Sequence, residues 1–95
     1  MLKIDKELEN RIKKDVDEYF IKNDMKYKAK EIYRQSQYPD DDYLYMVIAE
    51  RTDNKGYAVW TSWNTGLRSI NYGHYGISSL SSCHEIIEEF TRYIF

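Results

Sequence analysis

The sequence predicts an α+β fold with an N-terminal amphipathic helix, an antiparallel sheet of three or four strands in a meander, and a C-terminal helix packed on one face. Three observations predict this fold. Apolar residues recur every four positions near the N-terminus, apolar runs separated by turn residues fill the middle, and a second helical pattern ends the chain. The 95 residues, 42% hydrophobic and 32% charged, suit one globular domain over 1–95.

The first predicted element is an amphipathic helix over residues 4–21. Its apolar residues recur every four positions, and most of the other positions hold acids or bases, so that one face is apolar. Glu9 precedes Lys13 by four residues, which is the order of charges that favours a helix. The apolar residues of this face are Ile4, Leu8, Ile12, Val16 and Phe20.

Residues 25–37 fit two structures. Apolar residues alternate with lysines at its start, as in a strand, but the apolar spacing over the whole segment also fits a helix. We favour an edge strand over Tyr27–Gln35, because lysines on an edge strand discourage pairing between sheets. The sequence Tyr-Pro-Asp-Asp-Asp at 38–42 then predicts a turn, since proline fixes φ and aspartate side chains cap nearby backbone donors.

Three further strands follow. Tyr43–Thr52 is apolar on both faces, which is typical of a central strand. The turn sequence Asp53–Gly56 separates it from a strand over Tyr57–Asn64, and Thr65-Gly66 continues from Asn64 into a similar turn. Leu67–Tyr72 is the last predicted strand, which completes the meander.

The chain ends in a flexible loop and a helix. Gly73–Gly76 predicts the loop, and Ser82 predicts the start of the helix because Ser82 and Glu85 form a capping box. One face of this helix is apolar. Its residues are Cys83, Ile86, Ile87, Phe90, Tyr93 and Ile94.

The register of the sheet decides which face stays open. If both hairpin turns are three-residue bulged loops, Asp53 pairs with Tyr57 and Trp63 with Leu67. Both helices would then cover one set of residues, Leu44, Met46, Ile48, Ala58, Trp60, Ile70 and Tyr72. The opposite face would remain an exposed aromatic patch of Tyr43, Tyr45, Val47, Tyr57, Val59 and Trp63. A shift of one residue would exchange the two sets.

Charge and composition limit the classes of partner. Fourteen bases and sixteen acids give a net charge of −2, and no segment is strongly basic, which disfavours direct nucleic-acid binding. The order helix, three strands, helix resembles double-stranded RNA-binding domains only in topology, because the last helix opens with Ser82, His84 and Glu85 in place of a basic face. No apolar run approaches the roughly 20 residues of a membrane span. The single cysteine predicts the reducing cytoplasm.

No catalytic or metal-binding pattern is complete, so we expect no enzyme activity, no metal and no cofactor. His84-Glu85-x-x-Glu88 lacks the second histidine of a zinc protease motif. Cys83 could act as a nucleophile with His84 or His74 as its base. However, Cys83 falls on the apolar face of its helix, where a buried, inert thiol is usual.

The ten tyrosines are the most unusual feature of the composition. A small core cannot bury them all, because each buried hydroxyl needs a partner, and Tyr and Trp are enriched in protein interfaces. We therefore expect a small, non-enzymatic cytoplasmic protein that binds a protein partner through an aromatic surface. By analogy, small acidic tyrosine-rich domains without catalytic motifs are often inhibitors or adaptors, and one such group is made by phages and mobile elements against host defence or regulatory proteins.

Two alternatives remain for the function, namely sequestration of a small nucleotide-like ligand, or homodimerisation without a further partner. In the favoured interpretation, Asp40, Asp41 and Asp42 face a basic surface of the partner. The other predicted binding residues are Tyr43, Tyr45, Trp63, Asn64, His74 and Tyr75.

Overall fold

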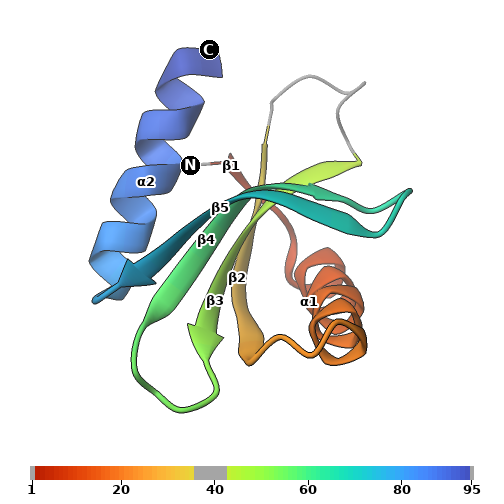
Figure 1. Ribbon diagram of the computed structural model, residues 1–95. Helices are drawn as coiled ribbons and strands as arrows, with labels where there is room; N and C mark the ends of the chain where they lie inside the picture. Colours follow the sequence, from red (N-terminus) through yellow and green to blue (C-terminus); the bar gives the residue numbers. More distant parts are fainter. Residues whose placement is uncertain (1, 36–42, 95) are drawn as a thin grey trace.

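The computed structural model describes residues 2–35 and 43–94, which form one antiparallel sheet with a helix on each face (Figure 1). The elements are β1 (Leu2–Lys3), α1 (Lys6–Lys22), β2 (Tyr27–Arg34), β3 (Leu44–Arg51), β4 (Tyr57–Asn64), β5 (Ser69–Ile77) and α2 (Leu80–Ile94). The strands lie in the sheet in chain order. The predicted α+β meander is therefore confirmed, and the two-residue β1 extends it beside β2.

The sequence patterns place α1 and β2 correctly. Helix α1 begins after Asp5, whose carboxylate accepts a hydrogen bond from the backbone N–H of Leu8 at 2.8 Å. Its buried residues are Ile12, Val16 and Phe20, as the four-residue spacing predicts. The segment that fitted both a helix and a strand is the strand β2.

Helix α2 begins two residues before the predicted start. Ser79 caps it, because the Ser79 hydroxyl accepts a hydrogen bond from the backbone N–H of Ser82 at 3.1 Å. Ser82 therefore lies inside the first turn, and the predicted capping box with Glu85 is wrong. The predicted loop Gly73–Gly76 is also wrong, since these residues belong to β5.

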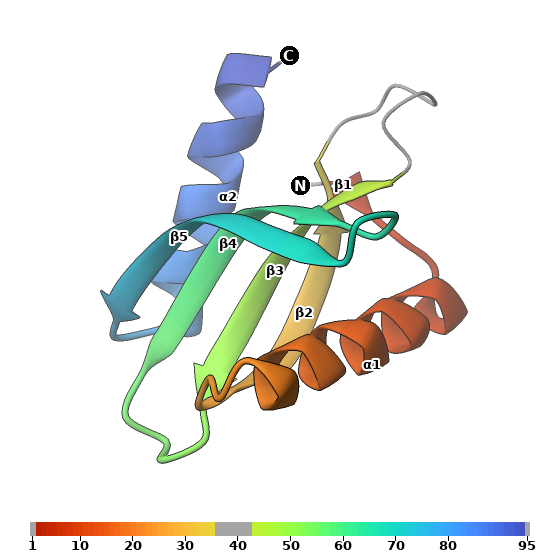
Figure 2. The same ribbon diagram turned by 45° about the vertical axis from the view of Figure 1, so that its right-hand side comes forward.

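The prediction that both helices cover one face of the sheet is wrong. Figure 2 shows α1 and α2 on opposite sides of the sheet. The core beneath α1 contains Tyr45, Val47, Ala49, Ala58, Trp60 and Trp63. The core beneath α2 contains Tyr33, Met46, Ile48, Val59 and Ile77.

The predicted register of the strands is also wrong. Tyr57 pairs with Glu50 instead of Asp53, and Trp63 pairs with Ile70 instead of Leu67. Each pairing is displaced by three residues, and an odd displacement exchanges the faces of one strand relative to its neighbour. Both turns are longer than the three-residue loops that the glycines suggested.

A bulge in β4 brings both tryptophans to the α1 side. Tyr45 pairs with Trp63 but Val47 pairs with Trp60, so one extra β4 residue is accommodated at Thr61 and Ser62. The Thr61 carbonyl accepts a hydrogen bond from the Gln35 side chain at 2.8 Å. In a regular strand, two residues three positions apart would point to opposite faces.

Candidate functional site

Several predicted binding residues do not lie on an open surface. Tyr45 and Trp63 are buried beneath α1, so the exposed face that was to contain them does not exist. Asn64 is partly buried, and its side-chain oxygen accepts a hydrogen bond from the backbone N–H of Leu67 at 2.9 Å. The acidic run Asp40–Asp42 and the rest of its predicted turn lie outside the described residues.

The exposed aromatic side chains instead gather on the β4–β5 hairpin. Tyr75 is 60% exposed and His74 is exposed on β5, while Tyr43 is exposed directly before β3. Leu67, which sequence reasoning did not select, is 78% exposed. Tyr72, which was expected to lie beneath the helices, is 75% exposed, so that expectation is wrong. We call the exposed side chains of Leu67, Tyr72, His74 and Tyr75 the hairpin surface.

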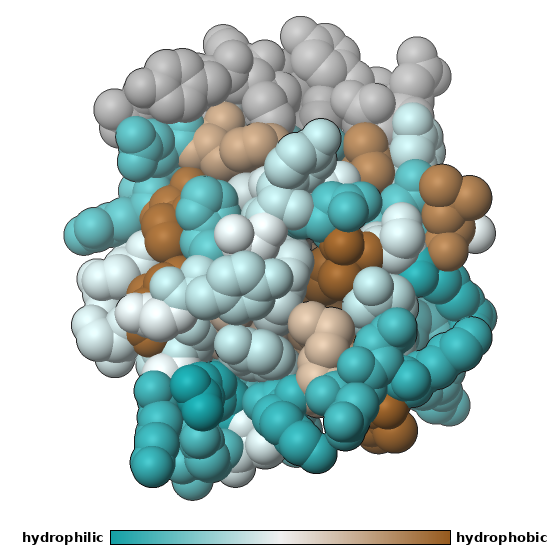
Figure 3. Space-filling model, viewed as in Figure 1, coloured by the Kyte–Doolittle hydropathy of each residue, from teal (hydrophilic) through white to brown (hydrophobic). Residues whose placement is uncertain are grey.

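The hairpin surface is nearly free of charge. Between residues 57 and 79 the only Asp, Glu, Lys or Arg is Arg68. Figure 3 shows side chains of intermediate hydropathy over the middle of the view, where β4 and β5 lie, and strongly hydrophilic residues along its lower edge. Charge depletion together with exposed tyrosines is the composition of an interface centre.

Gly73 allows Tyr75 to fold back over Trp60. The Tyr75 hydroxyl accepts a hydrogen bond from the Trp60 indole N–H at 3.2 Å, and the two rings meet edge to face at 5.5 Å. A Cβ atom on Gly73 would lie 2.5 Å from the Tyr75 hydroxyl and 2.8 Å from the indole nitrogen. The absence of a side chain at Gly73 therefore fixes the position of an exposed tyrosine.

The fixed tyrosine belongs to an aromatic cluster that reaches from the surface to the core. Trp60 contacts Phe20 and Tyr27 with ring centroids 5.3 and 5.2 Å apart, and Phe20 contacts Tyr19 at 6.4 Å. Tyr19 meets Trp63 edge to face at 5.5 Å. Such pairs hold rings in defined positions, so the Tyr75 ring at the surface is held in place by its neighbours.

Backbone strain accompanies this arrangement. Tyr72 has a φ of 60°, in the left-handed region that a bulky side chain rarely adopts. It lies beside the bulge of β4, because Ser62 pairs with Asn71 and Trp60 with Gly73. Strained residues of this kind concentrate where a side chain must take a particular direction, and here the Tyr72 side chain points into solvent.

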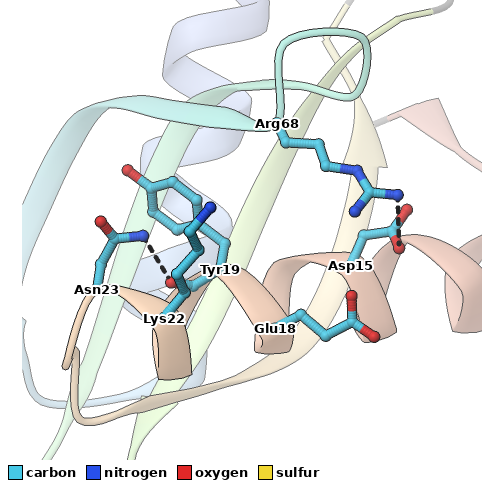
Figure 4. Close-up of a pocket in the computed structure, with 6 residues that line it drawn as sticks. All are labelled: Asp15, Glu18, Tyr19, Lys22, Asn23 and Arg68. Atoms are coloured by element: carbon cyan, nitrogen blue, oxygen red, sulfur yellow. Dashed lines mark hydrogen bonds and ion pairs between the residues drawn. The ribbon is translucent and has the colours of Figure 1, made fainter.

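A groove lies between α1 and the turn of the β4–β5 hairpin (Figure 4). It has a volume of about 280 Å³ and is lined by Asp15, Glu18, Tyr19, Lys22, Asn23 and Arg68. The Arg68 guanidinium crosses it to within 4.0 Å of the Asp15 carboxylate. Two carboxylates and two cations line this groove, so it lacks the single sign of charge that would select an anion or a cation.

A second polar cluster lies between β2 and α2. The Glu31 carboxylate accepts a hydrogen bond from the Tyr33 hydroxyl. Its Oε1 atom also lies 2.9 Å from His84 Nε2. Burial alone would raise the pKa of Glu31. The hydrogen bonds with Tyr33 and His84, together with the nearby charges of His84 and Lys13, outweigh this effect, so the pKa of Glu31 is lowered from its ordinary value. Burial and the adjacent carboxylate raise the pKa of Tyr33.

The lowered pKa of Glu31 predicts a dependence of stability on pH. Its charged form contributes stability above the ordinary glutamate pKa of about 4.3, and this contribution is lost as the pH falls through the folded-state pKa. We expect Glu31→Gln to lower the urea midpoint at pH 7 and to flatten its decline between about pH 6 and pH 3. Glu85→Gln, at an exposed position of α2, is the matched control. Parallel curves for Glu31→Gln and the wild type would contradict the role of the carboxylate.

Cys83 is in a position that suits packing and not nucleophilic chemistry. The Cys83 side chain is fully buried between α2 and the sheet. Burial together with the charge of Glu31 raises the pKa of its thiol to about 11. His74, one of the two candidate bases, lies on the exposed strand β5. The other, His84, is engaged with Glu31.

Native Cys83 is expected to resist alkylation. Only the thiolate reacts, and both the high pKa and the burial of the thiol suppress it. At about pH 8, iodoacetamide should modify native protein at least roughly a hundredfold more slowly than urea-unfolded protein. Mass spectrometry of the time course measures both rates. Similar rates in the two states would show that the thiol is accessible.

Residues 2–35 and 43–94 contain no group of three or more His, Cys, Asp or Glu side chains arranged to hold a metal ion. Neither helix in this part of the chain has the length and apolar character needed to cross a membrane.

Comparison with known proteins gives one match. A family model described as "Large polyvalent protein associated domain 24" matches residues 11–81, which include most of α1, all four long strands and the start of α2. No curated protein and no solved structure matches significantly. The matched residues contain Trp60, Gly73 and Tyr75 together with the rest of the hairpin surface.

Proposed function

The chain belongs to the large polyvalent protein associated domain 24 family. We propose that this member of the family is a non-enzymatic protein-binding module whose contact site is the hairpin surface. The observation that carries the proposal is that Tyr72, Tyr75 and Leu67 are exposed on a hairpin whose only charged residue is Arg68. Exposed tyrosines that are fixed in place lose little conformational entropy when they bind.

The family description associates the domain with large polyvalent proteins. We propose that the module acts in the cytoplasm on a protein partner. Its biological role, by analogy with other small acidic domains rich in tyrosine, is inhibition of a host defence or regulatory protein by a phage or mobile element.

Capture from a lysate of the source organism tests the proposal. The tagged chain is cross-linked, and captured proteins are compared with those of Leu67→Ser/Tyr72→Ser, which changes two exposed side chains that belong to neither hydrophobic core. We expect the double variant to lose the partner at least about tenfold. Ile21→Ser, at an 80% exposed position on α1, should retain it. Equal capture by the double variant and by Ile21→Ser would refute the proposed site.

A further inference from the structure

We infer that the hairpin surface binds a second copy of this chain, with the two β5 strands antiparallel along the free edge of the sheet. This inference rests on the proposed function and adds a second copy of the chain as an occupant of the same surface. β5 is the last strand of the sheet, and Figures 1 and 2 show no further strand outside it among the described residues. An edge strand presents unpaired backbone N–H and C=O groups that another strand can bind.

The two edges of the sheet differ in their protection against pairing. Lys28 and Lys30 are exposed on β2, and β1 covers the end of that strand. β5 spans nine residues, Ser69–Ile77, with no Asp, Glu, Lys, Arg or Pro. Natural proteins commonly use charged side chains or proline to prevent edge pairing. Of these two strands, only β2 has charged side chains that protect its edge against pairing.

The absence of charge favours a second copy over a partner of opposite charge. In a two-fold symmetric interface each patch meets an identical patch, so a patch with charges of one sign would repel its own copy. β5 has no such charge. The nearest one, Arg68, is directed toward Asp15 of its own α1 (Figure 4). Two copies can therefore approach along β5 without like-charge repulsion.

The backbone of β5 limits the strength of this association. Tyr72 and Gly76 have φ values of 60° and 70°, which interrupt the straight edge and leave Ser69–Asn71 and Gly73–Tyr75 as its regular parts. Short backbone pairing combined with contacts of the exposed rings of Tyr72 and Tyr75 makes a small interface. A small interface corresponds to a transient dimer, with a dissociation constant on the order of 10–100 µM.

Sedimentation equilibrium of the full chain, from about 10 µM to about 1 mM, measures this dissociation constant. Asn71→Lys places a new charge at an exposed position of β5 in both copies and should weaken the dimer at least about tenfold. Ile21→Lys adds the same charge to an exposed position of α1 and should leave the dissociation constant unchanged. Thermal unfolding of both variants verifies that they are folded.

Backbone amide NMR over the same concentrations locates the interface. We expect the concentration-dependent shifts to fall within Ser69–Ile77 and the neighbouring turn. A monomer at about 1 mM, a dimer unaffected by Asn71→Lys, or shifts confined to the outer faces of α1 or α2 would each overturn the inference. If the chain is monomeric but Leu67→Ser/Tyr72→Ser loses a captured protein, the proposed function stands without the dimer. If both experiments fail, the hairpin surface is not a binding site.

Discussion

Replacing Trp63 with alanine is expected to lower the free energy of unfolding by about 3–5 kcal/mol. Trp63 is fully buried beneath α1 and contacts the Tyr19 ring edge to face at 5.5 Å. Its removal leaves a cavity between the helix and the sheet, and both the lost burial and the cavity contribute to the cost. Since a small domain has a total stability of about 5–15 kcal/mol, a substantial fraction of the variant should be unfolded in mild denaturant.

Urea unfolding followed by far-ultraviolet circular dichroism measures this loss, because the signal does not depend on the deleted indole. Leu67→Ala is the control, since Leu67 is largely exposed in the turn before β5. Its effect should remain within about 0.5 kcal/mol. If Trp63→Ala proved as mild as Leu67→Ala, Trp63 would lie on an open face, and the arrangement of α1 on the sheet would be wrong.

Replacing Gly73 with alanine should cost about 1–3 kcal/mol, the range for overpacking. The new methyl group would lie 2.5 Å from the Tyr75 hydroxyl and 2.8 Å from the Trp60 indole nitrogen, closer than real Cβ atoms approach other groups. The Tyr75 ring can swing into solvent, but Trp60 is buried and cannot move freely. The substitution therefore breaks the hydrogen bond that fixes Tyr75.

A double-mutant cycle separates the steric clash with Tyr75 from the steric clash with Trp60. Tyr75→Ala removes one of the two groups that clash, so Gly73→Ala should cost less in that background, although the conflict with Trp60 persists. Gly66→Ala is a matched control in the turn before β5, because its nearest non-neighbouring atom would be the Asn64 side-chain oxygen at 3.3 Å. Additive effects of Gly73→Ala and Tyr75→Ala would contradict the contact between these residues.

Periodicity in the sequence was enough to predict the two helices and the long strands, but not all of their bounds. The four-residue spacing of Ile12, Val16 and Phe20 identified α1 and its buried face. The apolar character of both sides of β3 identified the central strand, whose Val47 and Ile48 are buried beneath different helices. These features depend on local spacing alone, so no information from distant parts of the chain was required.

Local spacing could not predict which side chains of neighbouring strands lie on the same face of the sheet. Turn residues such as Gly56 and Gly66 mark where a turn occurs but fit loops of several lengths, and an error of three residues exchanged the faces. The bulge at Thr61 and Ser62 has no sequence signature, although it decides that Trp60 and Trp63 share one core.

The candidate site was only partly predictable for a related reason. A tyrosine suits both a core and a surface, so Tyr45 and Tyr75 looked alike in the sequence although one is buried and the other exposed. Tyr72 was missed because the incorrect register placed it on the face that both helices were expected to cover. Glu31 and His84 interact across 53 positions of the chain, beyond any local pattern.

The chain-order arrangement of the strands has a consequence for how the protein forms during synthesis. Each long strand pairs with the one made just before it, so β2 to β5 can join the growing sheet as they leave the ribosome. Contacts between sequence neighbours also favour rapid folding, because little loop entropy is lost as each hairpin closes. β5, the strand with the uncharged edge, is the last to join, so this edge is present only after the rest of the sheet has assembled.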